Sequence, residues 1–223
     1  MTSKQFSVFE KFRDEFKQKI EEWKSSAENT PIIYNKALDE IKTKSEIKLL
    51  IIGDNPGKLE KETGKYFVGQ AGKLGEKFFC NNYNKLKIYF RKNVIILNKT
   101  PIHSAITTDL KKIEQQDLKK LIKESQEWMA EKTLELAKAL NIKIWIIGYS
   151  ELNKPNGIFK EYKNKFLNIK HSSEWENIFV FQHFSRNWFN RDLNKFCKEN
   201  PNLSLWEALN KLGETHKNKI FGN

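Results

Sequence analysis

The sequence is poor in cysteine and arginine, and it has no long apolar run. Its 223 residues include two cysteines, Cys80 and Cys197, which excludes a disulfide scaffold and a cluster held by four thiolates. The longest apolar runs, such as residues 49–52, are far shorter than the roughly 20 residues of a membrane helix. The polar start, Met1 to Lys4, lacks the apolar core of a signal peptide. We therefore expect a cytoplasmic protein with reduced thiols.

Positive charge is abundant, but little of it is arginine. The chain has 40 basic and 28 acidic residues, a net charge of +12, and its arginines are at positions 13, 91, 186 and 191 only. Lysine, asparagine and isoleucine crowd the whole chain, as in a genome of biased composition, so net charge alone favours nucleic acid only weakly. Arginine pairs with phosphate oxygens in a fixed geometry. Two arginines between Arg186 and Arg191 therefore indicate a positioned anion contact, unless their proximity is chance.

The first part of the chain has the apolar period of a helix. Large apolar side chains recur there every three or four residues, at Phe9, Phe12, Phe16, Ile20 and Trp23. This spacing predicts an amphipathic helix whose aromatic stripe belongs to the core rather than to a partner surface. A short second helix is predicted over residues 33–41, after the capping signal Thr30-Pro31. We predict one domain over residues 1–223, in which a helical extension, 1–44, precedes a core, 45–200.

After residue 45 the pattern changes to short apolar runs, each closed by a small or polar residue. Buried strands are predicted at 47–52, 94–97, 144–147 and 178–182. Helices are predicted at 71–79, 110–140, 157–166, 191–198 and 205–216. Strands that alternate with helices predict an α/β fold, in which a four-stranded, mostly parallel sheet lies between two helical layers.

The residues that end the four strands should share one site, because ligands of parallel sheets bind beyond the carboxyl ends of the strands. These residues are Gly53–Gly57, Asn98, residues 148–150 and His183–Ser185. Taken alone, residues 54–57 have the composition of a turn. The segment Gly64–Gly72 follows, and its glycines permit close backbone approach to a ligand, while Phe67 offers a flat face.

These segments resemble the uracil-DNA glycosylase superfamily over about residues 45–200. Gly53–Gly57, Gly-Asp-Asn-Pro-Gly, is similar to the first motif of the family. Residues 67–72, Phe-Val-Gly-Gln-Ala-Gly, match the segment that follows that motif in the iron–sulfur branch, and His183–Ser185 is similar to the second motif, His-Pro-Ser. Asn98 stands where the family has its base-reading asparagine. The resemblance implies an enzyme that hydrolyses the N-glycosidic bond of uracil or a related deaminated base in DNA.

The resemblance implies three catalytic residues. His183 would hydrogen-bond the uracil carbonyl as negative charge builds on the departing base, although a histidine here could also be a cap or a core residue. Asn55 and Asp54 would position the water or support the sugar cation. We favour Asn55 for the water and Asp54 as its auxiliary, but branches of the family use either position, and the roles could be reversed.

The base pocket implied by the resemblance involves Asn98, Phe67, Gly53 and Gly57. The amide of Asn98 has both a donor and an acceptor for the edge of uracil. Phe67 would stack on the flipped base, unless it is only a core phenylalanine. Gly57 stands where the best-known uracil-only branch has a tyrosine that blocks the thymine methyl group. This difference would open the pocket to 5-substituted or otherwise altered bases.

The implied partner is DNA that contains uracil or a related lesion, and its target base must leave the stack to react. Arg186 and Arg191 are candidates for the flanking phosphates, with Ser185 assisting. Trp188 is the candidate wedge that fills the gap, unless it is a buried aromatic. We expect a monomer with no membrane partner.

The sequence also departs from the family pattern. Two cysteines stand in place of the four cluster ligands of the iron–sulfur branch, so we expect no cofactor and no metal. Phe184 replaces the proline of the second motif, and Thr100-Pro101 after the base-reading position also diverges.

Two other functions stay open. One is a superfamily member that holds nucleic acid or a nucleobase without cleaving it. The other is an unrelated nucleotide-binding enzyme whose loop 55–57 cradles phosphate. Residues 53–72 lack the glycine spacing of a dinucleotide fingerprint and the Gly-Lys-Ser/Thr ending of a P-loop, which disfavours the second.

Overall fold

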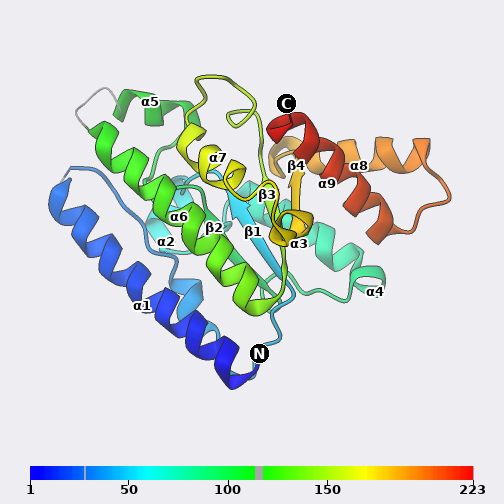
Figure 1. The fold of residues 1–223 in the computed structure, drawn as a ribbon, viewed down its shortest axis with the longest axis horizontal. Helices are drawn as coiled ribbons and strands as arrows, with labels where there is room; N and C mark the ends of the chain where they lie inside the picture. The colour runs from blue at the N-terminus through cyan, green and yellow to red at the C-terminus, as the bar shows by residue number, and fades with distance from the viewer. Residues whose placement is uncertain (28, 114–117, 223) are drawn as a thin grey trace.

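In the computed structural model, four parallel strands form one sheet between two layers of helices (Figure 1). The structure describes residues 1–27, 29–113 and 118–222. The strands are β1 (Leu49–Gly53), β2 (Val94–Asn98), β3 (Lys143–Ile147) and β4 (Ile178–Phe181). Their order in the sheet is β2-β1-β3-β4, and every neighbouring pair is parallel. The predicted α/β fold is therefore confirmed.

Helices connect the strands and cover both faces of the sheet. They are α1 (Ser3–Ser26), α2 (Lys58–Thr63), α3 (Gln70–Asn81), α4 (Tyr83–Leu86), α5 (Leu110–Ile113), α6 (Lys119–Leu140), α7 (Lys160–Leu167), α8 (Trp188–Glu199) and α9 (Leu205–Phe221). Short 3₁₀ helices are η1 (Lys36–Glu40), η2 (Thr107–Asp109), η4 (Ser173–Asn177) and η5 (Ser185–Asn187). Over the described ranges, no helix has the length and apolar character that crossing a membrane requires.

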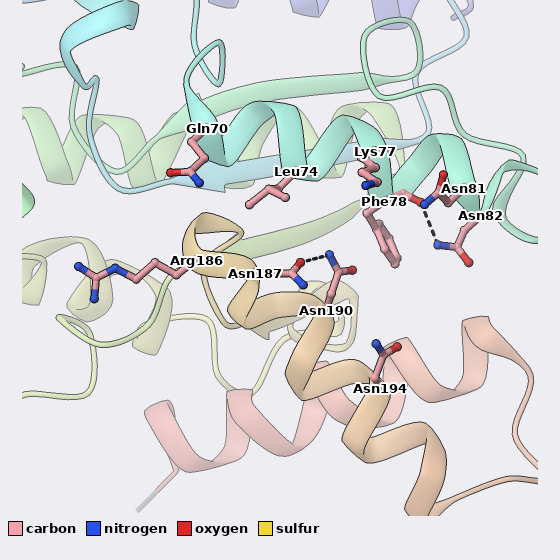
Figure 2. Close-up of a pocket in the computed structure, with 10 residues that line it drawn as sticks. All are labelled: Gln70, Leu74, Lys77, Phe78, Asn81, Asn82, Arg186, Asn187, Asn190 and Asn194. Atoms are coloured by element: carbon pink, nitrogen blue, oxygen red, sulfur yellow. Dashed lines mark hydrogen bonds between the residues drawn. The ribbon is translucent and has the colours of Figure 1, made fainter.

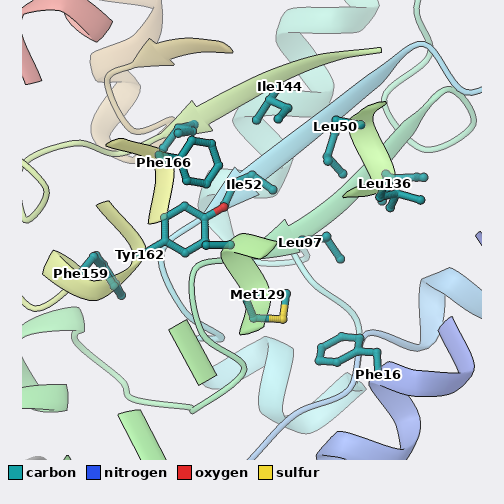
Figure 3. Close-up of a cluster of buried hydrophobic side chains, with 14 of the residues drawn as sticks. Phe16, Leu50, Ile52, Leu97, Met129, Leu136, Ile144, Phe159, Tyr162 and Phe166 are labelled. Carbon is teal, nitrogen blue, oxygen red and sulfur yellow. The ribbon is translucent and has the colours of Figure 1, made fainter. Parts of the chain in front are cut away.

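Alternate residues of each strand face opposite helical layers, as the pleat of a strand requires. Leu50, Ile52 and Leu97 pack in the cluster that contains α1, α6 and α7 (Figure 3). Their neighbours in sequence, such as Leu49 and Ile51, pack in the cluster that contains α3, α8 and α9. The strands are thus buried on both sides, which explains why they read as continuous apolar runs.

Two predicted helices differ from the structure. The α-helix predicted over 33–41 is only the 3₁₀ turn η1, because Ile32 pairs with Ile102 in an antiparallel bridge and the Ile33 N–H donates to the Pro101 carbonyl. These contacts hold the preceding chain extended. The helix predicted over 110–140 is described as α5 and α6, and residues 114–117 between them lie outside the described residues.

Helix α1 packs along α6, with which it lies side by side in Figure 1. All members of its aromatic stripe are buried, as predicted. The ring of Phe16 stacks on Trp128 of α6, with centroids 5.4 Å apart. A capping box fixes the start of the helix, because Thr2 accepts from the Gln5 N–H and the Gln5 side chain accepts from the Thr2 N–H. The stripe therefore belongs to the core rather than to a free surface.

Replacing Phe16 should therefore destabilise the whole chain. We expect Phe16→Ala to lower the free energy of unfolding by about 3–5 kcal/mol, since it removes a fully buried ring and leaves a cavity. Urea denaturation followed by circular dichroism measures this loss. Lys11→Ala, on the exposed side of the same helix, should change stability by less than about 0.5 kcal/mol. An unchanged main transition in Phe16→Ala would mean that α1 folds as a separate appendage.

Candidate active site

The carboxyl ends of the four strands open into one pocket of about 690 Å³. The predicted site residues in its lining are Asp54, Asn55, Gly57, Phe67, Asn98, His183, Ser185, Arg186 and Trp188. Two predicted residues lie outside that lining. Gly53 lies beneath Phe67 and Asn98, and Arg191 lies beside Trp188, with its guanidinium carbon 5.5 Å from the indole centroid. Most of the predicted site residues therefore lie together at the ends of the strands.

An ion pair joins Asp54, in the lining of this pocket, to a fully buried lysine. The side chain of Lys99, the residue after β2, is fully buried, and its Nζ lies 2.5 Å from Asp54 Oδ1. The same ammonium donates to the carbonyl oxygens of Ile147 (3.1 Å) and Gly148 (3.0 Å). Burial lowers the pKa of Lys99, and the charge of Asp54 opposes this effect. The pair therefore joins the end of β1 to the end of β3.

Gly148 lets two functional side chains approach the backbone at this point. Its φ is +85°, a conformation that L side chains rarely adopt. A Cβ atom on Gly148 would lie 3.0 Å from His183 Cδ2 and 3.1 Å from each carboxylate oxygen of Asp54. The imidazole and the carboxylate therefore both pack against a position that needs glycine.

Asn55 is oriented by a serine that sequence reasoning missed. The Asn55 Nδ2 donates to Ser104 Oγ (2.9 Å) and to the Ser104 carbonyl (3.2 Å). Ser104 Oγ in turn donates to the Ile106 carbonyl (2.9 Å). These bonds identify the Asn55 amide atom that faces Ser104 as the nitrogen. The Oδ1 atom is left as an acceptor for a molecule in the pocket.

His183 is held as a neutral ring of defined tautomer. The Ser185 backbone N–H donates to His183 Nδ1 (3.1 Å), and Ser185 Oγ lies 2.7 Å from the same atom. A backbone N–H can only donate, so Nδ1 is the acceptor and the proton lies on Nε2. Burial lowers the pKa of His183; Asp54 and Glu60 raise it, and Lys99 lowers it further. The ring therefore presents an Nε2–H donor without a positive charge.

Phe67 and Asn98 meet above Gly53. A Cβ atom on Gly53 would lie 2.3 Å from Phe67 Cε2 and 2.5 Å from Asn98 Oδ1, so no larger residue fits there. Among the described residues, the buried Asn98 Oδ1 has no hydrogen-bond partner. An unsatisfied buried acceptor costs about 1–3 kcal/mol. The described residues therefore leave this acceptor unsatisfied at the wall of the pocket.

The Phe67 backbone is strained and is held in place from two sides. Its φ is +55°, in the left-handed region. Arg91 donates to its carbonyl oxygen through Nη2 (2.6 Å), and a Cβ on Gly72 would lie only 1.5 Å from that oxygen. Backbone strain of this kind persists where the surrounding structure enforces it. Phe67 is buried among core aromatics and is also part of the pocket wall.

Two exposed apolar side chains stand at the rim of the pocket. Trp188, at the start of α8, is 48% exposed, and Ile106, in the loop after β2, is 63% exposed. Trp188 is therefore not a buried aromatic. Ile106 was not predicted, because an isoleucine in a loop carries no signal until the path of that loop is known.

Within the part of the chain that the structure describes, His, Cys, Asp and Glu side chains form no group of three or more that could hold a metal ion. Cys80 is exposed and Cys197 partly exposed, and both are free thiols. The chemistry available at the pocket comes from a neutral imidazole, several side-chain amides, the carboxylates of Glu60 and Glu151, the Asp54 carboxylate paired with a buried ammonium, and an aromatic wall.

This fold and this pocket define an α/β protein with a polar pocket at the carboxyl edge of a parallel sheet. Comparison with protein families adds the particular family. The model of the uracil DNA glycosylase superfamily matches residues 41–210, and the chain belongs to this superfamily. A comparison with curated proteins finds no match. The resemblance carried by the sequence motifs is therefore confirmed.

Replacing Asp54 should expose the dependence of the site on its ion pair. We expect Asp54→Asn to lower the free energy of unfolding by about 3 kcal/mol at pH 7, because Lys99 would remain buried without a counter-charge. Without that carboxylate the pKa of Lys99 falls further below its unfolded value. The unfolded state then binds more protons, so the stability of the variant rises with pH and its deficit narrows between pH 7 and about pH 10.

Urea denaturation over that pH range measures the effect, and Asp14→Asn is the matched control. Asp14 pairs with Arg13 on the surface, and its side chain is 64% exposed, so its loss should change stability by less than about 0.5 kcal/mol. Equal losses in the two variants would show that the Lys99 pair contributes no more than a surface contact.

Proposed function

We propose that the chain is a monofunctional DNA glycosylase that hydrolyses the N-glycosidic bond of uracil or a related deaminated base in DNA. Its superfamily suggests glycosylase-type chemistry. The observation that carries the proposal is the buried Asn98 Oδ1, which has no partner among the described residues. The N–H of a uracil edge would satisfy this oxygen, and the Asn98 amide nitrogen would donate to the adjacent carbonyl.

Base recognition in this proposal requires extrusion of the nucleotide from the duplex, because the reactive bond is inaccessible inside it. The Phe67 ring, which contacts Gly53 beside Asn98, offers a face for the flipped base. A Cβ atom on Gly57 would lie 2.7 Å from Glu60 Oε2, so the Glu60 carboxylate lines this part of the pocket. A base with a substituent at its 5-position is a candidate substrate alongside uracil only if Glu60 leaves room for that substituent.

The departing base takes on negative charge, and His183 is the group that would stabilise it. The neutral ring donates from Nε2 because Ser185 occupies Nδ1. A preorganised donor of this kind contributes about 10²–10³-fold to a rate. Because the ring is uncharged at neutral pH, its contribution grows as charge develops on the base rather than when the neutral base binds.

Asn55 and Asp54 face the sugar side of the reaction in this proposal. Asn55 Oδ1 would accept a proton from the attacking water, since its Nδ2 is committed to Ser104. Asp54 would support the positive charge on the sugar. Lys99 holds Asp54 Oδ1 and shares its charge, which makes Asp54 the auxiliary and Asn55 the water-positioning residue.

The DNA partner would lie across the rim of the pocket. Arg186 and Arg191 are exposed and suit the phosphates that flank the flipped nucleotide, with Ser185 beside them. Trp188 is exposed at this rim and is the candidate wedge for the gap in the duplex. The net charge of +12 adds affinity that falls with salt.

Release of uracil from labelled oligonucleotides tests the proposal. The substrates carry uracil opposite guanine, opposite adenine and in a single strand, with hypoxanthine and xanthine lesions alongside. We expect the wild-type chain to release base and His183→Ala or Asn55→Ala to be slower by about 10²-fold or more in single turnover. Unchanged melting temperatures would show that the variants fold.

His171→Ala and Asn164→Ala are the matched controls, because both side chains are exposed and lie outside the pocket lining. They should release base at the wild-type rate. No release from any substrate, with DNA binding intact, would contradict the proposal and favour a superfamily member that binds nucleic acid without cleaving it.

The pH profile of base release should report His183. Because burial lowers the pKa of His183, the ring stays neutral as the pH falls through about 6.5, the ordinary value for histidine. Protonation then places a second N–H on Nδ1 against the donating Ser185 N–H. We expect the single-turnover rate to fall only below about pH 6.5. The residual activity of His183→Gln should show no such decrease. A decrease in the wild-type rate that begins at or above that pH would contradict a neutral His183.

A further inference from the structure

A second pocket of about 500 Å³ adjoins the candidate active site (Figure 2). It lies between α3 and α8, and it shares Gln70 and Arg186 with the first pocket. In Figure 2, α3 forms its upper wall and α8 its lower wall. We call this pocket the amide groove. Because the two pockets share a border, a polymer bound in one can continue into the other.

The lining of the groove is unusually rich in side-chain amides. The amide residues are Gln70, Asn81, Asn82, Asn187, Asn190 and Asn194, and the other lining residues are Leu74, Lys77, Phe78 and Arg186. No carboxylate is among these ten described residues, which disfavours a metal ion or a cationic ligand. Amides present donors and acceptors together, as the edge of a nucleobase does.

Several of these amides have hydrogen-bonding groups to spare. Asn190 Nδ2 donates to Asn187 Oδ1 (2.6 Å), and Asn82 Nδ2 donates to the Phe78 carbonyl (2.9 Å). These bonds orient the amides, so that Asn187 Nδ2 and Asn190 Oδ1 remain for a ligand. Leu74 and Phe78 supply an apolar strip between the amides. An apolar surface edged by polar groups suits a flat heterocycle.

The chain is strained where the two pockets meet. Arg186 and Asn187 are consecutive residues with positive φ, +52° and +60°. In Figure 2, Asn187 points toward Asn190 in the groove, whereas Arg186 extends in the opposite direction. Such strain is retained where the surrounding structure enforces it, often at a binding site. The kink thus places the Arg186 side chain at the border and the Asn187 amide inside the groove.

We propose that the amide groove binds a nucleotide that neighbours the flipped one on the same DNA strand. This inference rests on the proposed function, because that function places a DNA nucleotide in the first pocket. Arg186 contacts the phosphate at the border, the amides of α8 contact the edge of the neighbouring base, and Lys77 balances charge at the rim. The site would favour substrates in which this neighbouring base is unpaired.

Binding of short oligonucleotides tests the inference. The probes are deoxyuridine monophosphate and trinucleotides that extend deoxyuridine by two nucleotides in either the 5′ or the 3′ direction. Calorimetry uses the Asn55→Ala background, so that bound probes are not turned over. Asn190→Asp/Asn194→Asp keeps the side-chain shape but adds negative charge and removes donors. We expect this double variant to weaken binding of the trinucleotide of one polarity by about tenfold or more. Binding of the mononucleotide should be unchanged.

Asn164→Asp/Asn168→Asp is the matched control, because it adds the same charge to exposed positions at α7, on the other face of the sheet. It should change the dissociation constant of each of the three probes by less than about twofold. Asn190→Ala/Asn194→Ala, which adds no charge, should weaken the same trinucleotide as the aspartate pair does. Equal weakening of both polarities, equal weakening by the α7 control, or no weakening by either groove variant would overturn the inference.

The two proposals fail in different ways. Base release without any sensitivity of trinucleotide binding to the groove variants would overturn the groove and leave the glycosylase standing. Sensitivity of one trinucleotide to the groove variants, without base release from any substrate, would support the groove and overturn the glycosylase.

Discussion

The end of the molecule that holds the candidate active site depends on one buried cation. Lys99 has to place an ammonium in the core, and the acceptors that make this possible belong to the ends of β1 and β3 and to Asp54. Its backbone N–H also donates to the Gly53 carbonyl. The strand ends are thereby tied to one point, and the charge of Lys99 also helps to keep His183 neutral. Lys99 thus contributes both to the architecture of the pocket and, beside the larger effect of burial, to the neutral state of His183.

The sequence predicts the sheet and the strand-end residues well for a simple physical reason. Parallel strands expose their carboxyl ends at one edge, so Asp54, Asn98 and His183 had to meet once the four apolar runs were recognised. Lys99 and Ser104 were missed because their roles depend on where neighbouring backbone carbonyls lie. Lys99 is one of 36 lysines, and no neighbour in the sequence marks it as buried.

The same limit explains the error over residues 33–41. Local propensity favours a helix there, but a tertiary contact, the bridge between Ile32 and Ile102, holds the incoming chain extended. Non-local pairing also decides the shape of the pocket wall. Phe67 takes a left-handed conformation because Arg91 holds its carbonyl and Gly72 leaves space for it. Glycine positions were readable in the sequence, whereas the contacts that require them were not.

Helix α9 has a consequence for how the chain folds as it is made. Its first half, with Leu209 and Leu212, packs in one core cluster, and its last residues, Ile220 and Phe221, pack in the other. Since α9 follows every strand in chain order, a nascent chain carries a complete set of strands before either layer is closed. We therefore expect the growing chain to expose apolar surface on both sides of the sheet until α9 emerges.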